Sequence, residues 1–111
     1  MVNRHRGEVA AQLDGRDWTL CLTLGALAQL ESAFEADNLS DLIVRFSGGK
    51  LSAFDMQRII CAGLHGGGHD VPLADVAEMR ADGGASGYAR IVSALLTATF
   101  GAAESDSPSN P

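Results

Sequence analysis

The sequence predicts an α+β, mainly α fold in which an N-terminal β-hairpin packs on four to five short helices. Two observations support this fold class. Within residues 6–23, apolar and polar residues alternate in two runs on either side of Asp14-Gly15, the pattern of a half-buried hairpin. After Thr23, apolar residues recur every three to four positions, as in amphipathic helices. The 111 residues, 46% of them apolar, are enough for one compact core.

The hairpin is expected to turn at Asp14-Gly15, because both central residues of a type I′ turn need positive φ and these residue types adopt it. This turn fixes the register of the facing pairs: Leu13 with Arg16, Ala11 with Trp18, and Val9 with Leu20. The apolar faces of the two strands then coincide. A lone hairpin is marginally stable in water, so we expect it to lie on the helices.

Helices are expected over about residues 24–36, 39–47, 53–64, 72–81 and 85–100. Thr23 and Asn38 are predicted N-caps, and Ser52 with Asp55 predicts a capping box. The core-facing stripes are predicted to be Leu24, Leu27, Leu30 and Phe34; Leu39, Leu42, Ile43 and Phe46; Met56, Ile59, Ile60 and Leu64; Leu73, Val76 and Met79; and Ile91, Val92, Leu95, Leu96 and Phe100. The glycine-rich segment 65–69 predicts a flexible connection. We expect residues 1–101 to form a single globular domain and residues 102–111 to form a disordered polar tail.

Composition and charge narrow the classes of function. The formal net charge of −6 and the pI near 4.8 argue against a nucleic-acid partner, which normally requires a basic surface. The two cysteines form no Cys-x-x-Cys motif, which favours a reducing compartment. The sequence contains neither the apolar segment of a signal peptide nor a run of about 18 apolar residues that could span a membrane. We therefore expect a soluble cytoplasmic protein without a membrane partner.

Residues that could carry chemistry are few. His65 and His69 are four residues apart, which is a metal-ligand spacing only on a helix, and Asp70 could be a third ligand. The three glycines between the histidines favour a solvent-exposed loop instead. Glu31 and Glu35 could form a carboxylate pair, although such pairs more often mark a solvated helix face. We assign no metal-binding residue.

Nucleophilic catalysis is also disfavoured. Cys61 could be a nucleophile, but its apolar neighbours favour a core thiol. Ser86 has no evident histidine and acid partners, and favours a helix cap. Neither a Walker-type nor a dinucleotide-binding glycine pattern is present. We therefore expect no catalytic residue, no cofactor and no enzyme activity.

A protein-binding surface is the remaining class of site. The apolar residues of helices 53–64 and 85–100 could exceed what one small core can bury. Candidate partner-binding residues are Ile59, Ile60, Leu95, Leu96 and Phe100. The alternative is that all five pack internally.

The order of four segments resembles a known family. These segments are residues 3–9, residues 13–15, residues 22–28 with Leu30-Glu31, and residues 62–69. Together they resemble the small gene transfer agent family of phage-like particles, encoded between the major tail protein and the tape measure protein. The likeness covers about residues 3–101 and rests on order and spacing, since none of these motifs is a catalytic signature.

The resemblance implies a tail assembly chaperone, although some members are labelled tail tube proteins. Such a chaperone binds the long tape measure protein and keeps it soluble until tail tube subunits polymerise around it. Implied partners are the tape measure protein and the major tail tube protein. Repeated weak binding along one long client further predicts that copies of the chain associate into rings or helical stacks. A permanent structural subunit of the tail is the alternative function, and a metal-dependent enzyme using His65 and His69 is a third.

Overall fold

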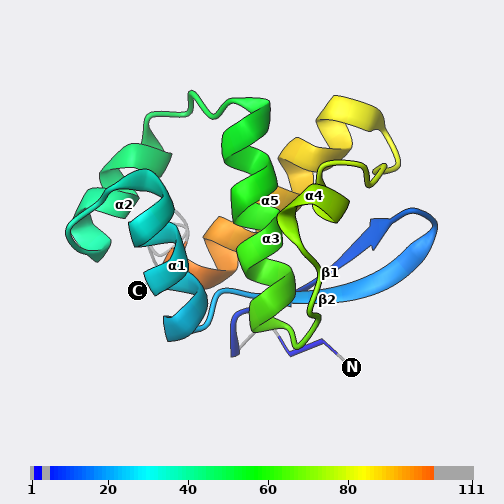
Figure 1. The fold of residues 1–111 in the computed structure, drawn as a ribbon, viewed down its shortest axis with the longest axis horizontal. Coiled ribbons are helices and arrows are strands. Elements are labelled where there is room, and N and C mark those ends of the chain that lie inside the picture. Colours follow the sequence, from blue (N-terminus) through cyan, green and yellow to red (C-terminus); the bar gives the residue numbers. More distant parts are fainter. Residues whose placement is uncertain (1, 4–5, 102–111) are drawn as a thin grey trace, which may run out of the picture.

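A computed structural model describes residues 2–3 and 6–101, and every structural statement below refers to these. A two-stranded antiparallel sheet lies against a group of five helices, and α3 stands at the centre of the molecule (Figure 1). The elements are β1 (Glu8–Leu13), β2 (Arg16–Cys21), α1 (Leu24–Phe34), α2 (Leu39–Ser47), α3 (Ala53–Gly66), α4 (Leu73–Val76) and α5 (Gly84–Phe100). The predicted fold class is confirmed. The tail predicted over 102–111 lies outside the described residues.

The hairpin has the predicted register. The facing pairs are Leu13 with Arg16, Ala11 with Trp18, and Val9 with Leu20. Asp14 and Gly15 have φ values of 58° and 72°, as a type I′ turn requires. The indole N–H of Trp18 donates to the Leu13 carbonyl at 3.0 Å, which adds a side-chain bond near the turn.

The predicted helix caps are also present. The Thr23 hydroxyl accepts from the backbone N–H of Ala26 at 3.1 Å, and the Asn38 side chain accepts from the N–H of Asp41 at 2.9 Å. Ser52 and Asp55 form a complete capping box. Each cap satisfies an amide of the first turn that has no partner within its helix, so the starts of α1, α2 and α3 are fixed locally.

The core lies where α3 meets its neighbours, because α3 contacts β2, α1, α4 and α5. The largest fully buried side chains are Leu13, Leu20, Leu30, Leu42, Ile59, Leu64 and Leu95. Three leucine or isoleucine residues of the predicted stripes are exposed instead. Leu24 is 72% exposed, while Leu39 and Ile43 are 39% and 43% exposed. The inward faces of α1 and α2 are therefore narrower than the spacing of apolar residues predicted.

The end of α3 differs from the prediction. The helix continues through His65 to Gly66, where a flexible connection was expected. The glycines serve close packing against β2 instead: a Cβ added to Gly66 would lie 1.8 Å from the Cys21 carbonyl oxygen, and one added to Gly67 would lie 1.9 Å from that of Thr19. Only glycine allows the backbones of α3 and β2 to approach this closely.

The fourth helix is shorter than the predicted 72–81. It covers Leu73–Val76 only, because the following residues leave the helix to bond with the hairpin turn. The N–H of Asp14 donates to the Arg80 carbonyl at 2.8 Å, and the Asp14 carboxylate accepts from the Arg80 N–H at 2.9 Å. Leu13 forms a β-bridge with Ala81. These bonds hold the segment after α4 against the tip of the hairpin.

Candidate partner-binding surface

The five residues predicted to bind a partner divide into two groups. Ile59, Ile60 and Leu95 have 0%, 3% and 0% of their surface exposed, since they fill the core between α3 and its neighbours. Leu96 and Phe100, on the C-terminal half of α5, are partly exposed and pack against the edge of the core. Of the predicted set, these last two present accessible surface to a partner.

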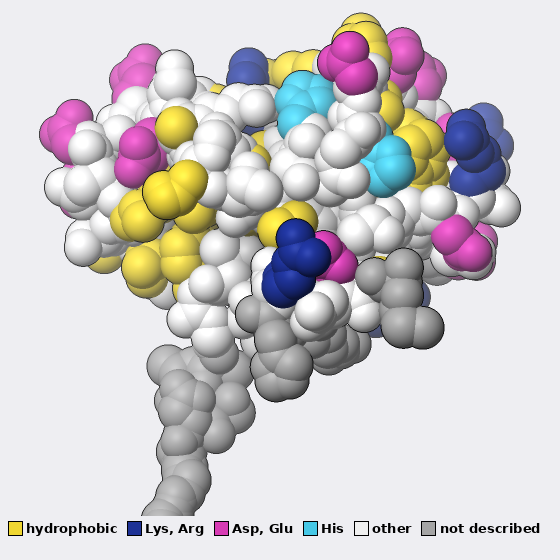
Figure 2. Space-filling view, turned by 90° about the horizontal axis from the view of Figure 1, so that it is seen from below, with side chains coloured by type: hydrophobic (Ala, Val, Ile, Leu, Met, Phe, Trp, Pro, Cys, Tyr) yellow, Lys and Arg dark blue, Asp and Glu magenta, His cyan; other side chains and the backbone are white. Residues whose placement is uncertain are grey.

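Other apolar side chains are more exposed and lie on α2 and at the start of α3. Ile43, Val44 and Phe54 are 43%, 71% and 53% exposed, and Leu39 lies one turn before Ile43. We call Leu39, Ile43, Val44 and Phe54 the α2–α3 surface. Seen from below, hydrophobic side chains also gather on the side of the molecule where α1 and α2 lie (Figure 2), in a view that faces away from the start of α3. Sequence reasoning missed this surface because it assigned Leu39 and Ile43 to the core and gave no role to Val44 and Phe54.

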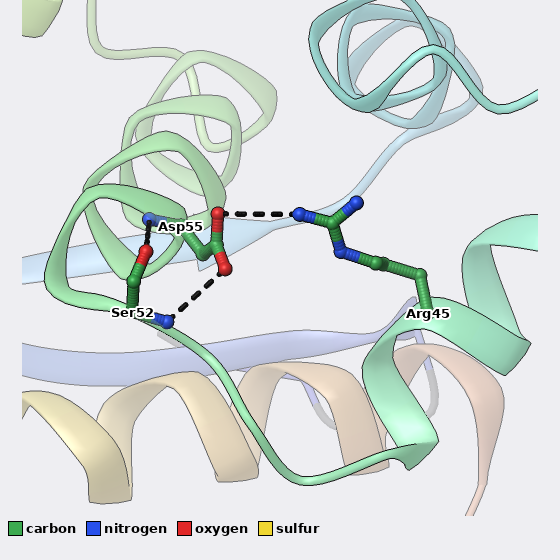
Figure 3. Close-up of polar contacts among 3 residues, drawn as sticks. All are labelled: Arg45, Ser52 and Asp55. Atoms are coloured by element: carbon green, nitrogen blue, oxygen red, sulfur yellow. Dashed lines mark hydrogen bonds and ion pairs between the residues drawn. The ribbon is translucent and has the colours of Figure 1, made fainter.

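A polar corner positions α2 against α3 (Figure 3). Asp55, the one charged residue buried within the described ranges, accepts from the N–H of Ser52 at 3.1 Å. The other oxygen of its carboxylate lies 3.6 Å from Nη2 of Arg45 on α2. The Ser52 hydroxyl accepts from the N–H of Asp55 at 3.0 Å. The capping box therefore aims a carboxylate at the last turn of α2.

Two arginines stack on phenylalanine rings around this corner. The Arg45 guanidinium carbon lies 4.9 Å from the centre of the Phe34 ring, and that of Arg58 lies 4.5 Å from the centre of the Phe54 ring. A shallow hollow of about 270 Å³ opens between these side chains, where α1 ends and α3 begins. The hollow thus joins apolar rings to two guanidinium groups and to the carboxylates of Glu35 and Asp55.

A cysteine–histidine pair lies elsewhere on α3. The Cys61 sulfur is 3.6 Å from Nε2 of His65, because the longer helix places both residues on one face. Nε2 is also 2.7 Å from the Val71 carbonyl oxygen. Since a carbonyl only accepts, Nε2 carries a proton there and cannot take one from the thiol. Burial raises the pKa of Cys61, which further disfavours the thiolate. The pair therefore closes the loop after α3 rather than forming a nucleophile and its base.

The two histidines that stand at a metal-ligand spacing in the sequence have different surroundings. His65 faces Cys61 and Gln29, whereas the ring of His69 packs edge-on against Trp18, with centroids 5.0 Å apart. The part of the chain that the structure describes holds no group of three or more His, Cys, Asp or Glu residues arranged to hold a metal ion. Within those same ranges, no helix has both the length and the apolar character needed to cross a membrane.

Comparison with known proteins adds one finding. A family model described as "Phage tail tube protein, GTA-gp10" matches residues 6–102, which is most of the chain. No curated protein and no solved structure matches significantly. The matched range includes the hairpin, all five helices and the α2–α3 surface. The chain therefore belongs to this family of phage and gene transfer agent tail proteins, which comprises tail tube and tail assembly chaperone proteins and is not an enzyme family.

Proposed function

We propose that this protein is a cytoplasmic tail assembly chaperone that binds the tape measure protein of a phage-like gene transfer agent. It keeps that protein soluble until tail tube subunits polymerise around it. Membership of the tail assembly chaperone family supports the proposal. The single structural observation that carries it is the α2–α3 surface, where four large apolar side chains stay exposed on a small folded protein.

The α2–α3 surface suits a helical client. A tape measure protein is a long helix with exposed apolar stripes, and an apolar helix face is commonly recognised by another apolar helix face or groove. Leu39 and Ile43 lie one turn apart on α2 and share one face, and Val44 extends the exposed apolar area around the helix. Leu96 and Phe100 of α5 are proposed as further contacts.

The charge of the protein suits a solubilising role. The chain carries a formal net charge of −6, so a client coated by several copies would gain a strongly acidic surface. Like-charged complexes repel one another and remain in solution. Binding through a shallow surface also allows release, because each subunit contributes modest affinity. Self-association of neighbouring copies, or contact with the major tail tube protein, would add avidity along one long client.

Co-expression tests this proposal. A tape measure protein of such a phage-like particle is produced alone and together with this chain, and its soluble fraction is measured. The wild-type chain should raise the soluble yield and co-purify with the client. Val44→Asp places a charge at the most exposed position of the α2–α3 surface and should reduce co-purification about tenfold, the effect of losing one buried valine.

Ala94→Asp is the matched control, because it adds the same charge at an exposed position on α5. It should leave co-purification unchanged. An unchanged soluble yield with the wild-type chain would contradict the chaperone function. Equal loss with both variants would contradict the assignment to the α2–α3 surface.

A permanent structural subunit of the tail is the second candidate, because the family description reads "tail tube protein". Mass spectrometry of purified particles separates the two functions, since a tube subunit must be present in stoichiometric amounts. The sheet in the described residues has two strands, whereas a closed tube usually needs longer and more numerous strands. We therefore favour the chaperone.

A further inference from the structure

An apolar cavity lies on a different part of the molecule from the α2–α3 surface. It has a volume of about 150 Å³ and opens between the hairpin turn, α3, α4 and the start of α5. The apolar side chains that line it include Leu13, Met56, Ile60, Val76, Met79 and Tyr88. We call it the α4 cavity. Apolar cavities of about this size take up a molecule as large as benzene, so one bulky apolar side chain fits.

The lining of the α4 cavity can adapt to such a side chain. Met56 and Met79 are unbranched and polarisable, and methionine surfaces accommodate apolar side chains of several shapes. The rim includes Ala53, Ala77 and Ala85, whose small exposed side chains leave the mouth open. The backbone around the cavity is fixed, because Arg80 is bonded to the hairpin turn.

A negatively charged hollow adjoins the cavity and shares Met79 with it. Its lining contains four carboxylates: Asp14, Asp70, Asp75 and Glu78. We call these the acidic shelf. Arg16 is the one cation in the lining, and its guanidinium carbon lies 4.6 Å from the centre of the Trp18 ring. Within the described residues, none of the four carboxylates forms an ion pair. The shelf therefore presents unneutralised negative charge next to an apolar hole.

We propose that the α4 cavity is an anchor pocket for an amphipathic segment of the client that carries a bulky apolar residue flanked by lysine or arginine. The apolar side chain fills the cavity, and the flanking cation lies over the acidic shelf. Charge complementarity selects this occupant, since a segment with acidic flanks would be repelled. This inference rests on the proposed function and adds a second, chemically distinct contact to the α2–α3 surface.

The chain carries its own reporters for this site. Two of its three methionines, Met56 and Met79, line the cavity, and its single tryptophan, Trp18, lines the adjoining hollow. Methyl NMR of protein labelled at the methionine methyl groups should therefore show shifts of Met56 and Met79 when the co-expressed tape measure protein is bound. Trp18 fluorescence should change in the same complex.

Two variants test the chemistry of the pocket. Ala85→Phe places a ring at the cavity mouth and should weaken co-purification of the tape measure protein about tenfold, the effect of losing one buried apolar side chain. Ala94→Phe is its control, because that exposed position on α5 does not line the cavity. Asp70→Asn with Asp75→Asn should weaken binding and reduce its salt dependence.

Glu8→Gln with Asp17→Asn is the control for the charge variant, since it removes two carboxylates of the hairpin that lie outside the shelf. Thermal unfolding of every variant verifies that it folds. If wild-type protein solubilises the client while both pocket variants bind normally and the two methyl signals stay unmoved, the anchor pocket is refuted and the chaperone function stands. Methyl shifts that depend on protein concentration without client would assign the cavity to a second copy and refute the proposal.

Discussion

Replacing Gly66 by alanine should destabilise the fold, because this glycine lets the end of α3 lie directly on β2. An alanine Cβ at this position would be 1.8 Å from the carbonyl oxygen of Cys21, and 3.3 Å from the backbone nitrogen of Thr23. The first atom belongs to a strand backbone and cannot rotate away as a side chain could. Either α3 or β2 must therefore move.

The size of the effect follows from this geometry. Real Cβ atoms essentially never approach closer than 3.0 Å, so the displacement must reach at least the difference between 3.0 Å and 1.8 Å, which is 1.2 Å. Overpacking of this kind costs about 1–3 kcal/mol. Alanine gains up to about 1 kcal/mol over glycine in a helix interior, and less at the last residue of α3. We expect a net loss of about 2 kcal/mol.

Urea unfolding followed by circular dichroism measures this loss. With a slope of about 1–3 kcal/mol per molar, the midpoint should fall by about 1 M. Gly25→Ala is the matched control, because it lies in the first turn of α1 and its Cβ would have its nearest neighbour at 3.9 Å. It should be neutral or stabilising. If Gly66→Ala unfolds at the wild-type midpoint or above it, α3 does not dock on β2 as described.

Three further predictions concern stability. Ser52→Ala removes one half of the capping box and should lower the free energy of unfolding by about 1 kcal/mol, measured in urea, whereas Ser52→Gly should cost only a few tenths. Gly15→Ala places a side chain at a φ of 72° and should cost about 1–2 kcal/mol; a wild-type melting temperature would contradict the turn geometry. Burial raises the pKa of Cys61, so the folded state favours the protonated thiol. The protonated thiol should contribute fully to the free energy of unfolding below the ordinary thiol pKa of about 8.5, and this contribution should decline as pH rises beyond that value. Cys61→Ala should therefore lose less free energy of unfolding between pH 7 and pH 10 than the wild type does. An equal loss in the two proteins would contradict the raised pKa of Cys61.

Local features of the fold were predictable because they depend on a few neighbouring residues. The Asp14-Gly15 turn fixes φ at two positions and thereby the register of the whole hairpin. The caps at Thr23, Asn38 and Ser52 each need one side chain and an amide three residues later. No distant segment has to be known for either feature.

The end of α3 was not predictable from the same kind of signal. Three consecutive glycines locally favour a flexible chain, yet Gly66 ends a helix and Gly67 caps it. Contact with the backbone of β2 decides this, and that strand lies more than 40 residues earlier in the sequence. The Cys61–His65 contact went unpredicted for the same reason, because it requires the helix to reach residue 65.

The candidate site was only partly predictable. The sequence predicts apolar helix faces, and Leu96 and Phe100 are indeed accessible at the edge of the core. It cannot show which face turns inward, so Ile59 appeared to be available when it is fully buried. The α4 cavity joins the hairpin turn, α3 and the start of α5, and no window of sequence contains all of these.

By itself, the sequence determined the hairpin, its register, the helix starts, the acidic charge and the resemblance to a tail assembly family. The tertiary structure decided which apolar residues are buried, where α3 and α4 end, and which carboxylates gather beside a cavity. The physical reason is the range of the interactions. Turns and caps are satisfied within four residues of chain, whereas burial and charge clustering depend on what packs across the core.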